Sequence, residues 1–227
     1  MVQSINWPAI RVTARVLFGG RAALALPHVE VATIADLDFR KLRAIGCSGV
    51  VFDKDNTLTE PYVDALAPSL SGALREAREA FGEGRVAVLS NSAGTPDDPQ
   101  FAAATRLERA LGLPVLRRPH KKPRGFESVA AYFGDGCDPK SLVMVGDRYL
   151  TDVTFGNLHG MLCVRTEQLT TRGDNPVAQA MRRLEVVLVA LLRWLRVPAQ
   201  PHRLMDAARR CVKRRERSPR AERGRES

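Results

Sequence analysis

The chain has 227 residues, of which 44% are hydrophobic, and its formal net charge is +10. This length suits one globular core with extensions, and the composition supplies enough apolar residues to bury that core. Four cysteines without metal-type or disulfide-type spacing indicate a reducing compartment. No apolar run reaches the roughly 20 residues that are needed to span a bilayer.

The N-terminal segment is basic and partly apolar. Residues 5–26 have the pattern of a helix with an apolar face. They carry three arginines, with no acidic residue before position 30: Arg11, Arg15 and Arg21. We expect residues 1–45 to be an amphipathic segment that either targets or anchors the chain to a membrane, or packs as a helix on the core. Residues 26–29 end the first helix, and a short helix is predicted over residues 38–45.

The apolar run at residues 48–52 is typical of a buried strand, and it leads directly into Asp53 and Asp55. Carboxylates at the end of an apolar strand are costly to desolvate unless a cation pairs them, and ligands bind at strand ends in open α/β sheets. We therefore predict a Mg²⁺ site beside a carboxylate nucleophile. Asp53 attacks phosphorus and holds the metal, while Asp55 offers its carbonyl to the metal and its side chain as general acid and base. An Asx-turn is the simpler alternative, but it explains only one aspartate.

The segment from Asp53 to Thr57 resembles the first motif of the haloacid dehalogenase-like phosphohydrolases, D-x-D-x-T. The second motif of that superfamily is a Ser or Thr at the end of the next strand, where it binds a phosphoryl oxygen. After a predicted helix over residues 68–81, the strand-like run 85–89 ends at Ser90, and its neighbour Asn91 is a further phosphate-binding candidate. A polar turn after a strand is an equally good interpretation of the local sequence.

The third motif of the superfamily is a lysine that neutralises the nucleophile and the phosphoryl group. A predicted helix over residues 101–111 and a short strand at residues 115–116 precede Lys121 and Lys122. Lys-Pro is the usual pairing, so the resemblance assigns this role to Lys122. Lys121 is either a solvated neighbour or a substrate contact.

The fourth motif follows a predicted helix over residues 126–133. The apolar run 141–145 ends in Gly-Asp, and a second aspartate lies five residues further on. The resemblance makes Asp147 a Mg²⁺ ligand. It makes Asp152 a group that holds the metal's water shell or orients Lys122.

Strands that alternate with helices indicate the fold class. With a helix over residues 151–158 and a last strand over 162–164, we expect residues 46–175 to form an α/β core, a doubly wound parallel sheet with helices on both faces. The two intervals between the first three motifs are too short for the cap domain that relatives acting on small metabolites carry there. A capless site is open, which suits a large or membrane-held phosphate ester.

Residues 176–198 are predicted to form an amphipathic helix. Its expected apolar face comprises Met181, Leu184, Leu188, Leu191 and Leu195, and its polar face Arg182, Glu185, Arg193 and Arg196. The helix either lies on an anionic lipid surface or packs on the core or on a second copy. Residues 199–227 are a basic tail that we expect to be disordered, either solvating or attracted to an anionic membrane. No aromatic interleaving supports a nucleic-acid partner.

Together these motifs resemble the eukaryotic phosphatidylglycerophosphate phosphatases, especially plant and algal members, over about residues 5–197. The segments that carry the resemblance are 25–29, 49–59, 90–94, 121–123 and 145–148, with 182–185 and 193–195 closest to plant and algal chains. The resemblance implies Mg²⁺-dependent conversion of phosphatidylglycerophosphate to phosphatidylglycerol, the precursor of cardiolipin. It places the chain on a mitochondrial inner membrane, at the matrix face, or in a chloroplast.

One residue and two rival functions complete these expectations. Arg148, next to Asp147, is a candidate for holding the phosphodiester of the lipid headgroup. The rivals are a capless phosphatase of soluble esters or phosphoproteins, and a non-enzymatic membrane-associated scaffold. The complete set of motif residues argues against a scaffold: Asp53, Asp55, Ser90, Lys122 and Asp147.

Overall fold

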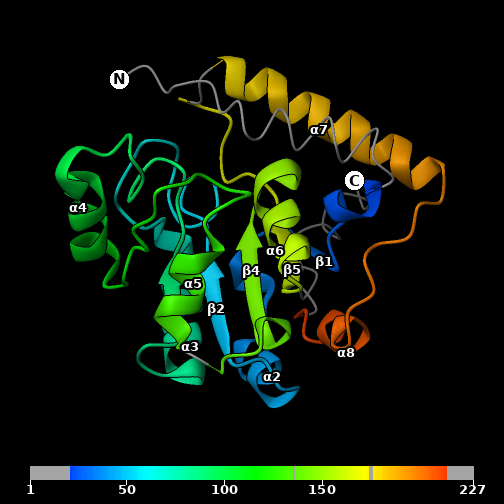
Figure 1. Ribbon diagram of the computed structural model, residues 1–227, viewed down its shortest axis with the longest axis horizontal. Coiled ribbons are helices and arrows are strands. Elements are labelled where there is room, and N and C mark those ends of the chain that lie inside the picture. The colour runs from blue at the N-terminus through cyan, green and yellow to red at the C-terminus, as the bar shows by residue number, and fades with distance from the viewer. Residues whose placement is uncertain (1–20, 135, 174–175, 214–227) are drawn as a thin grey trace, which may run out of the picture.

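The computed structural model describes residues 21–134, 136–173 and 176–213. At its centre lies a five-stranded parallel sheet in the order β1-β5-β4-β2-β3 (Figure 1). The strands are β1 (Val29–Val31), β2 (Gly49–Phe52), β3 (Val86–Val88), β4 (Leu142–Gly146) and β5 (Leu162–Thr166). Along β2, Val50 and Phe52 enter one core cluster and Val51 the other, as expected for a strand that is covered on both faces.

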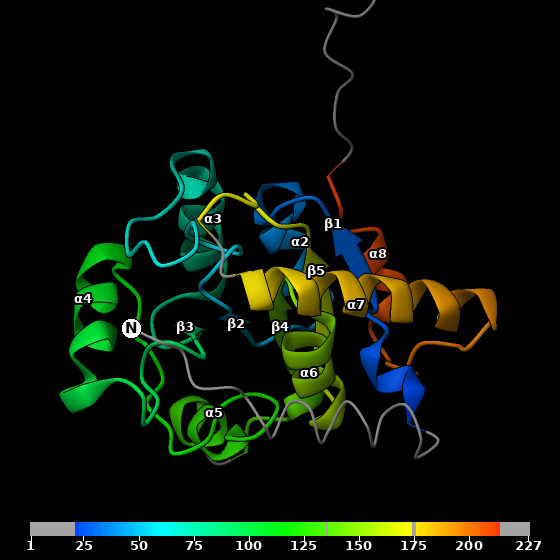
Figure 2. The same cartoon turned by 90° about the horizontal axis from the view of Figure 1, so that it is seen from above.

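Helices cover both faces of this sheet (Figures 1 and 2). One cluster of buried side chains joins the strands to α2 (Phe39–Ala44), α3 (Ser71–Phe81), α4 (Ala102–Leu111) and α8 (Met205–Arg209). A second cluster joins them to α5 (Phe126–Phe133) and α6 (Thr154–Leu158). The predicted fold class, a doubly wound α/β sheet, is therefore confirmed.

Short helices connect these elements. They are the 3₁₀ helices η1 (Ala22–Ala25), η2 (Ile34–Asp36), η3 (Pro68–Leu70), η4 (Pro99–Phe101) and η5 (Pro139–Ser141), and the π-helix η6 (Tyr149–Val153). The helix predicted over residues 151–158 thus begins earlier, as η6, and continues as α6. At α2, the Asp38 carboxylate accepts a hydrogen bond from the Lys41 N–H (2.9 Å), which caps the first turn.

The outer parts of the sheet differ from the prediction. β1 falls where the end of a helix was expected, and its three residues pair with Val164–Thr166 of β5. Three residues are too few to show the period of a strand, so only this distant pairing defines it. Val115 makes a single bridge to Val88 and adds no strand to the sheet. Of the predicted N-terminal helix, residues 1–20 lie outside the described residues, and η1 is the part that is described.

α7 (Pro176–Trp194) passes above the carboxyl ends of the strands (Figure 1). Its buried residues are Glu185, Val189 and Leu192, which contact η6, the helix that follows β4, and η1. The face that packs is not the expected apolar face, since Leu184, Leu191 and Leu195 of that face are exposed.

Residues 199–213 fold against the core, so the expectation of a disordered tail is wrong for them. α8 buries Ala208, Cys211 follows it into the core, and Val212 forms a bridge with Leu37. Apolar residues at positions 204, 208, 211 and 212 recur at helical spacing, and their side chains pack on the core. The prediction of disorder rested on the basic composition of the whole tail and did not weigh these four residues. Residues 214–227 lie outside the described residues.

Both intervals expected to lack a cap domain are described in full. Between Asp55 and Ser90 the helices and strands are η3, α3 and β3, and between Ser90 and Lys122 they are η4 and α4. These intervals are capless, as predicted, and the element above this end of the sheet is α7.

Candidate active site

The predicted site residues meet at one end of the sheet. Asp53 follows β2, Ser90 follows β3 and Asp147 follows β4, and these strands are neighbours in the order β4-β2-β3. The carboxyl ends of parallel strands share one edge, so residues far apart in sequence come together there.

Lys122 lies between two carboxylates at the base of this site. Its Nζ is 2.5 Å from Asp53 Oδ1 and 2.5 Å from Asp152 Oδ1, and all three side chains are buried. Of the two tasks predicted for Asp152, the structure shows the contact with Lys122. Desolvation on burial raises the pKa of Asp53 to about 6; Lys122 opposes this rise, while Asp152 and Asp55 add to it. The lysine therefore favours the anionic form that a nucleophile needs.

Asp55 is held by three hydrogen-bond donors and remains partly exposed. Its Oδ1 accepts from Lys54 Nζ (2.8 Å) and from the Tyr62 N–H (3.1 Å), and its Oδ2 accepts from Ser92 Oγ (2.9 Å). Lys54, between the two aspartates of the motif, is buried and paired with the Asp55 carboxylate. This network orients Asp55 toward the cavity, where a leaving oxygen or a water molecule would approach.

The turn after β3 is organised by an arginine that the sequence patterns did not single out. Arg118 is buried, which lowers its pKa to about 10, and its Nη2 donates to the Ser90 carbonyl and to Asn91 Oδ1, both at 2.7 Å. Asn91 Oδ1 also accepts from the Lys122 N–H (2.8 Å). The Ser90 hydroxyl is fully buried and accepts from the Ser92 N–H (3.1 Å). Asn91 and Ser92 line the cavity, whereas the buried Ser90 is not among the lining residues.

Three buried carboxylates provide a site that fits Mg²⁺. Single oxygens of Asp53, Asp147 and Asp152 lie within 4.8 Å of one another. Asp147 Oδ1 is buried without a hydrogen-bond partner, which is costly unless a cation contacts it. Oxygen donors of this type are those that Mg²⁺ prefers. The backbone carbonyl of Asp55, the other predicted ligand, stays a prediction.

A cavity of about 90 Å³ opens above these carboxylates, between the strand ends and α7. Its lining includes Asp53, Asp55, Asn91, Asp147, Arg148 and Arg182. Arg182 comes from α7 and pairs with Asp147 Oδ2, a contact that the helical pattern alone did not reveal.

The two remaining candidates lie in different settings. Arg148 lines the cavity, but its guanidinium is engaged by Glu185 of α7 through Nε (2.9 Å) and Nη2. Lys121 is not among the cavity-lining residues, and its Nζ lies 2.5 Å from Asp97.

Together, the parallel sheet and the carboxylates and lysine at its strand ends define a haloacid dehalogenase-like phosphatase. The family model described as mitochondrial PGP phosphatase matches residues 9–170. The chain therefore belongs to the phosphatidylglycerophosphate phosphatase family, a family of phosphoric monoester hydrolases.

Named relatives come from algae, plants and fungi. The chain is 48% identical over 187 residues to phosphatidylglycerophosphate phosphatase 1, chloroplastic, of Chlamydomonas reinhardtii, covering 82% of this chain and 68% of that protein. It is 41% identical over 215 residues to the chloroplastic/mitochondrial protein of the same name from Arabidopsis thaliana, covering 93% and 60%. It is 30% identical over 175 residues to a mitochondrial phosphatidylglycerophosphatase of Saccharomyces cerevisiae, covering 76% and 92%. The chain thus spans about two thirds of the length of the algal and plant proteins.

Proposed function

We propose that this chain is a Mg²⁺-dependent phosphatase that hydrolyses phosphatidylglycerophosphate to phosphatidylglycerol and phosphate, on the route to cardiolipin. The observation that carries this proposal is the cluster of Asp53, Lys122, Asp147 and Asp152 at the strand ends of a chain that belongs to this family. The names of the relatives supply the substrate.

The reaction proceeds in two steps on Asp53. First, a carboxylate oxygen of Asp53 attacks phosphorus, the bond from phosphorus to the glycerol oxygen breaks, and Asp55 gives that oxygen its proton. Asp55 then takes a proton from water, the water oxygen attacks phosphorus, and the bond to Asp53 breaks to release phosphate. Lys122 offsets the charge on Asp53 and on the phosphoryl oxygens throughout. Asp53, Asp147 and the Asp55 carbonyl would hold Mg²⁺, which would supply further stabilisation of the negative charge on the phosphoryl group.

The decisive measurement is release of phosphate from phosphatidylglycerophosphate in anionic vesicles, with Mg²⁺ and with a chelator. We expect Mg²⁺-dependent turnover that Asp53→Asn reduces at least about a thousandfold. Asp206→Asn, in a largely exposed side chain of α8, is the matched control and keeps wild-type turnover. Equal or faster turnover of a soluble phosphate ester would favour the soluble-substrate alternative. Turnover that Asp53→Asn leaves unchanged would not come from this site, and the scaffold alternative would then be favoured.

The same proposal places the chain on the surface of an anionic mitochondrial or chloroplast membrane. Across the described residues, none of the helices is both long enough and apolar enough to cross a bilayer. α7 nevertheless presents an outward apolar stripe over its whole length, and Trp194 at its end is 77% exposed. The stripe comprises Val177, Ala180, Leu184, Val187, Leu191 and Trp194. Exposed Arg183 and Arg196 flank it, so its charge suits anionic lipid.

Two neighbouring valines of α7 test this orientation. Val187 lies in the stripe and is 66% exposed, whereas Val186 lies about 100° around the helix and is 53% exposed. We expect Val187→Glu to reduce sedimentation with anionic vesicles severalfold, and Val186→Glu, which carries the same charge change, to reduce it less. Equal losses would argue for charge alone. A concentration-dependent dimer that only Val187→Glu disrupts would show that the stripe contacts a second copy.

A further inference from the structure

α7 carries an arginine into the active site. The Arg182 side chain is 13% exposed, lines the cavity together with Asp53 and Asp55, and pairs with Asp147 Oδ2. Asp147 Oδ1 is buried without a hydrogen-bond partner, so this oxygen is available to a metal ion. One carboxylate can therefore serve a metal through Oδ1 and hold the guanidinium through Oδ2.

The position of Arg182 is set by a second residue of the same helix face. Glu185 lies three residues along α7 and is 2% exposed. Its Oε1 accepts from Arg148 Nε (2.9 Å), and its Oε2 accepts from the Tyr149 N–H (3.0 Å). These bonds hold α7 on the segment that follows Asp147, so the guanidinium of Arg182 stays at the cavity.

The cations of the site lie on different sides of the cavity. Lys122 is buried and pairs with Asp53, the residue beside which the reacting phosphoryl group would bind. Arg182 lines the cavity from α7, the helix that passes above the strand ends (Figure 1). Arg148 was the expected contact for the lipid phosphodiester, but Glu185 engages its guanidinium through both Nε and Nη2. The contact of Arg182 with Asp147 is made through Nη1. A substrate with a second phosphate one glycerol away from the reacting one would place that phosphate on the α7 side.

We propose that Arg182 recognises the second phosphate, the anionic diester, of the substrate, so that α7 supplies the specificity contact in this capless site. This inference rests on the proposed function. A guanidinium offers a planar fork of donors that matches two phosphate oxygens, and a simple monoester has no second phosphate to place there. Arg182 thereby distinguishes phosphatidylglycerophosphate from soluble monoesters.

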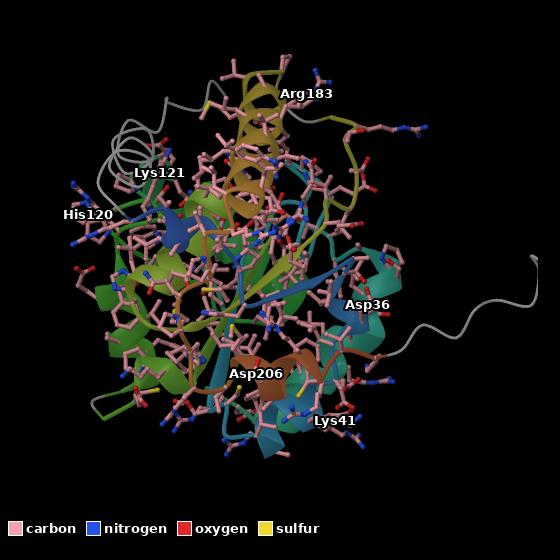
Figure 3. All side chains as sticks on the ribbon, turned by 90° about the vertical axis from the view of Figure 1, so that its right-hand side faces the viewer. Asp36, Lys41, His120, Lys121, Arg183 and Asp206 are labelled. Atoms are coloured by element: carbon pink, nitrogen blue, oxygen red, sulfur yellow. The ribbon has the colours of Figure 1, made fainter. Side chains whose placement is uncertain are left out.

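The test compares two substrates at saturating Mg²⁺, using the full-length chain and Arg182→Gln. We expect KM for short-chain phosphatidylglycerophosphate to rise about tenfold or more with little change in kcat, which is the effect of losing a charge-assisted contact. For p-nitrophenyl phosphate, which has no diester, kcat/KM should fall by a smaller factor, because only the pair of Arg182 with Asp147 is lost. Lys41→Gln is the control, because it removes the same charge from a largely exposed side chain of α2 at the end of the molecule opposite α7 (Figure 3).

A second measurement separates this inference from the proposed function. Glycerophosphoglycerol, a diester without a monoester phosphate, should inhibit p-nitrophenyl phosphate hydrolysis by the wild type, and its inhibition constant should rise about tenfold in Arg182→Gln. If the wild type does not hydrolyse phosphatidylglycerophosphate but the inhibition constant still rises in Arg182→Gln, the proposed function is contradicted. Arg182 then remains a contact for the diester. An equal loss with both substrates, or an unchanged inhibition constant, would overturn the role of Arg182.

Discussion

Replacing Gly146 with alanine tests how closely turnover depends on the position of Asp152. Gly146 is the last residue of β4, and a Cβ built there would lie 2.5 Å from Cβ and Cγ of Asp152 and 2.6 Å from its Oδ2. Carbon atoms in contact prefer roughly 3.5–4.0 Å, so the Asp152 side chain has to move by about 1 Å.

This movement acts on both partners of Asp152. Its Oδ1 is 2.5 Å from Lys122 Nζ, and its Oδ2 accepts from the Arg148 N–H (3.0 Å). Lys122 then loses one of the two carboxylates that hold it, and its alignment with Asp53 changes. Misplacing a catalytic group by about 1 Å costs on the order of a hundredfold in rate. We therefore expect kcat of Gly146→Ala to fall by about two orders of magnitude.

Steady-state kinetics with short-chain phosphatidylglycerophosphate measures this effect, and Tm establishes that the variant is folded. Gly72→Ala is the matched control, because a Cβ at Gly72 in α3 meets no atom within 4 Å. The control should retain wild-type kcat and gain slightly in stability. A folded Gly146→Ala variant with kcat within about threefold of wild type would refute the reasoning, because a clash of this size could not then disturb Lys122.

Three further predictions concern stability and are measured by denaturant unfolding. Burial lowers the pKa of His28 to about 4, below its ordinary 6.5, so protonation favours the unfolded chain. The free energy of unfolding should therefore fall by up to about 3 kcal/mol as pH drops from 6.5 to 4, and His28→Gln should flatten this slope. Gly49→Ala places a Cβ 2.3 Å from Phe133 Cε1 and should cost about 1–3 kcal/mol, part of which Phe133→Leu restores. Glu185→Gln removes the charge beside Arg148 and should cost about 1–3 kcal/mol; no loss would show that the pair adds nothing to stability.

The positions of the strand ends at the site were predictable because each is marked by residues that are close together in the sequence. Around Asp53 and Asp147, an apolar run stops at a carboxylate, and both the buried strand and the costly charge can be read within ten residues. Lys122 needed the superfamily resemblance, since a lysine in a loop is ordinarily a surface residue. The structure places Lys122 between Asp53 and Asp152.

Residues defined by distant contacts were not predictable in this way. Arg118 is one of two adjacent arginines, and only the fold decides that Arg117 pairs with Glu108 at the surface while Arg118 is buried under Ser90. β1 has the same limitation, because three residues become a strand only when β5 lies beside them. In both cases the sequence holds the residue type, but the partner that gives it a role lies far along the chain.

α7 shows why helical periodicity does not decide which face packs inward. Of the predicted apolar face, Leu184, Leu191 and Leu195 are exposed, because an apolar face is buried only where the core contacts it. Here the segment after Asp147 presents Arg148 and the Tyr149 N–H, and Glu185 satisfies both of them in a buried setting. Turning the stripe inward would leave the Arg148 charge without its partner, which costs more than exposing a few leucines and valines. The contacts of Glu185 beside the active site therefore orient the helix, and the outward apolar stripe is the consequence.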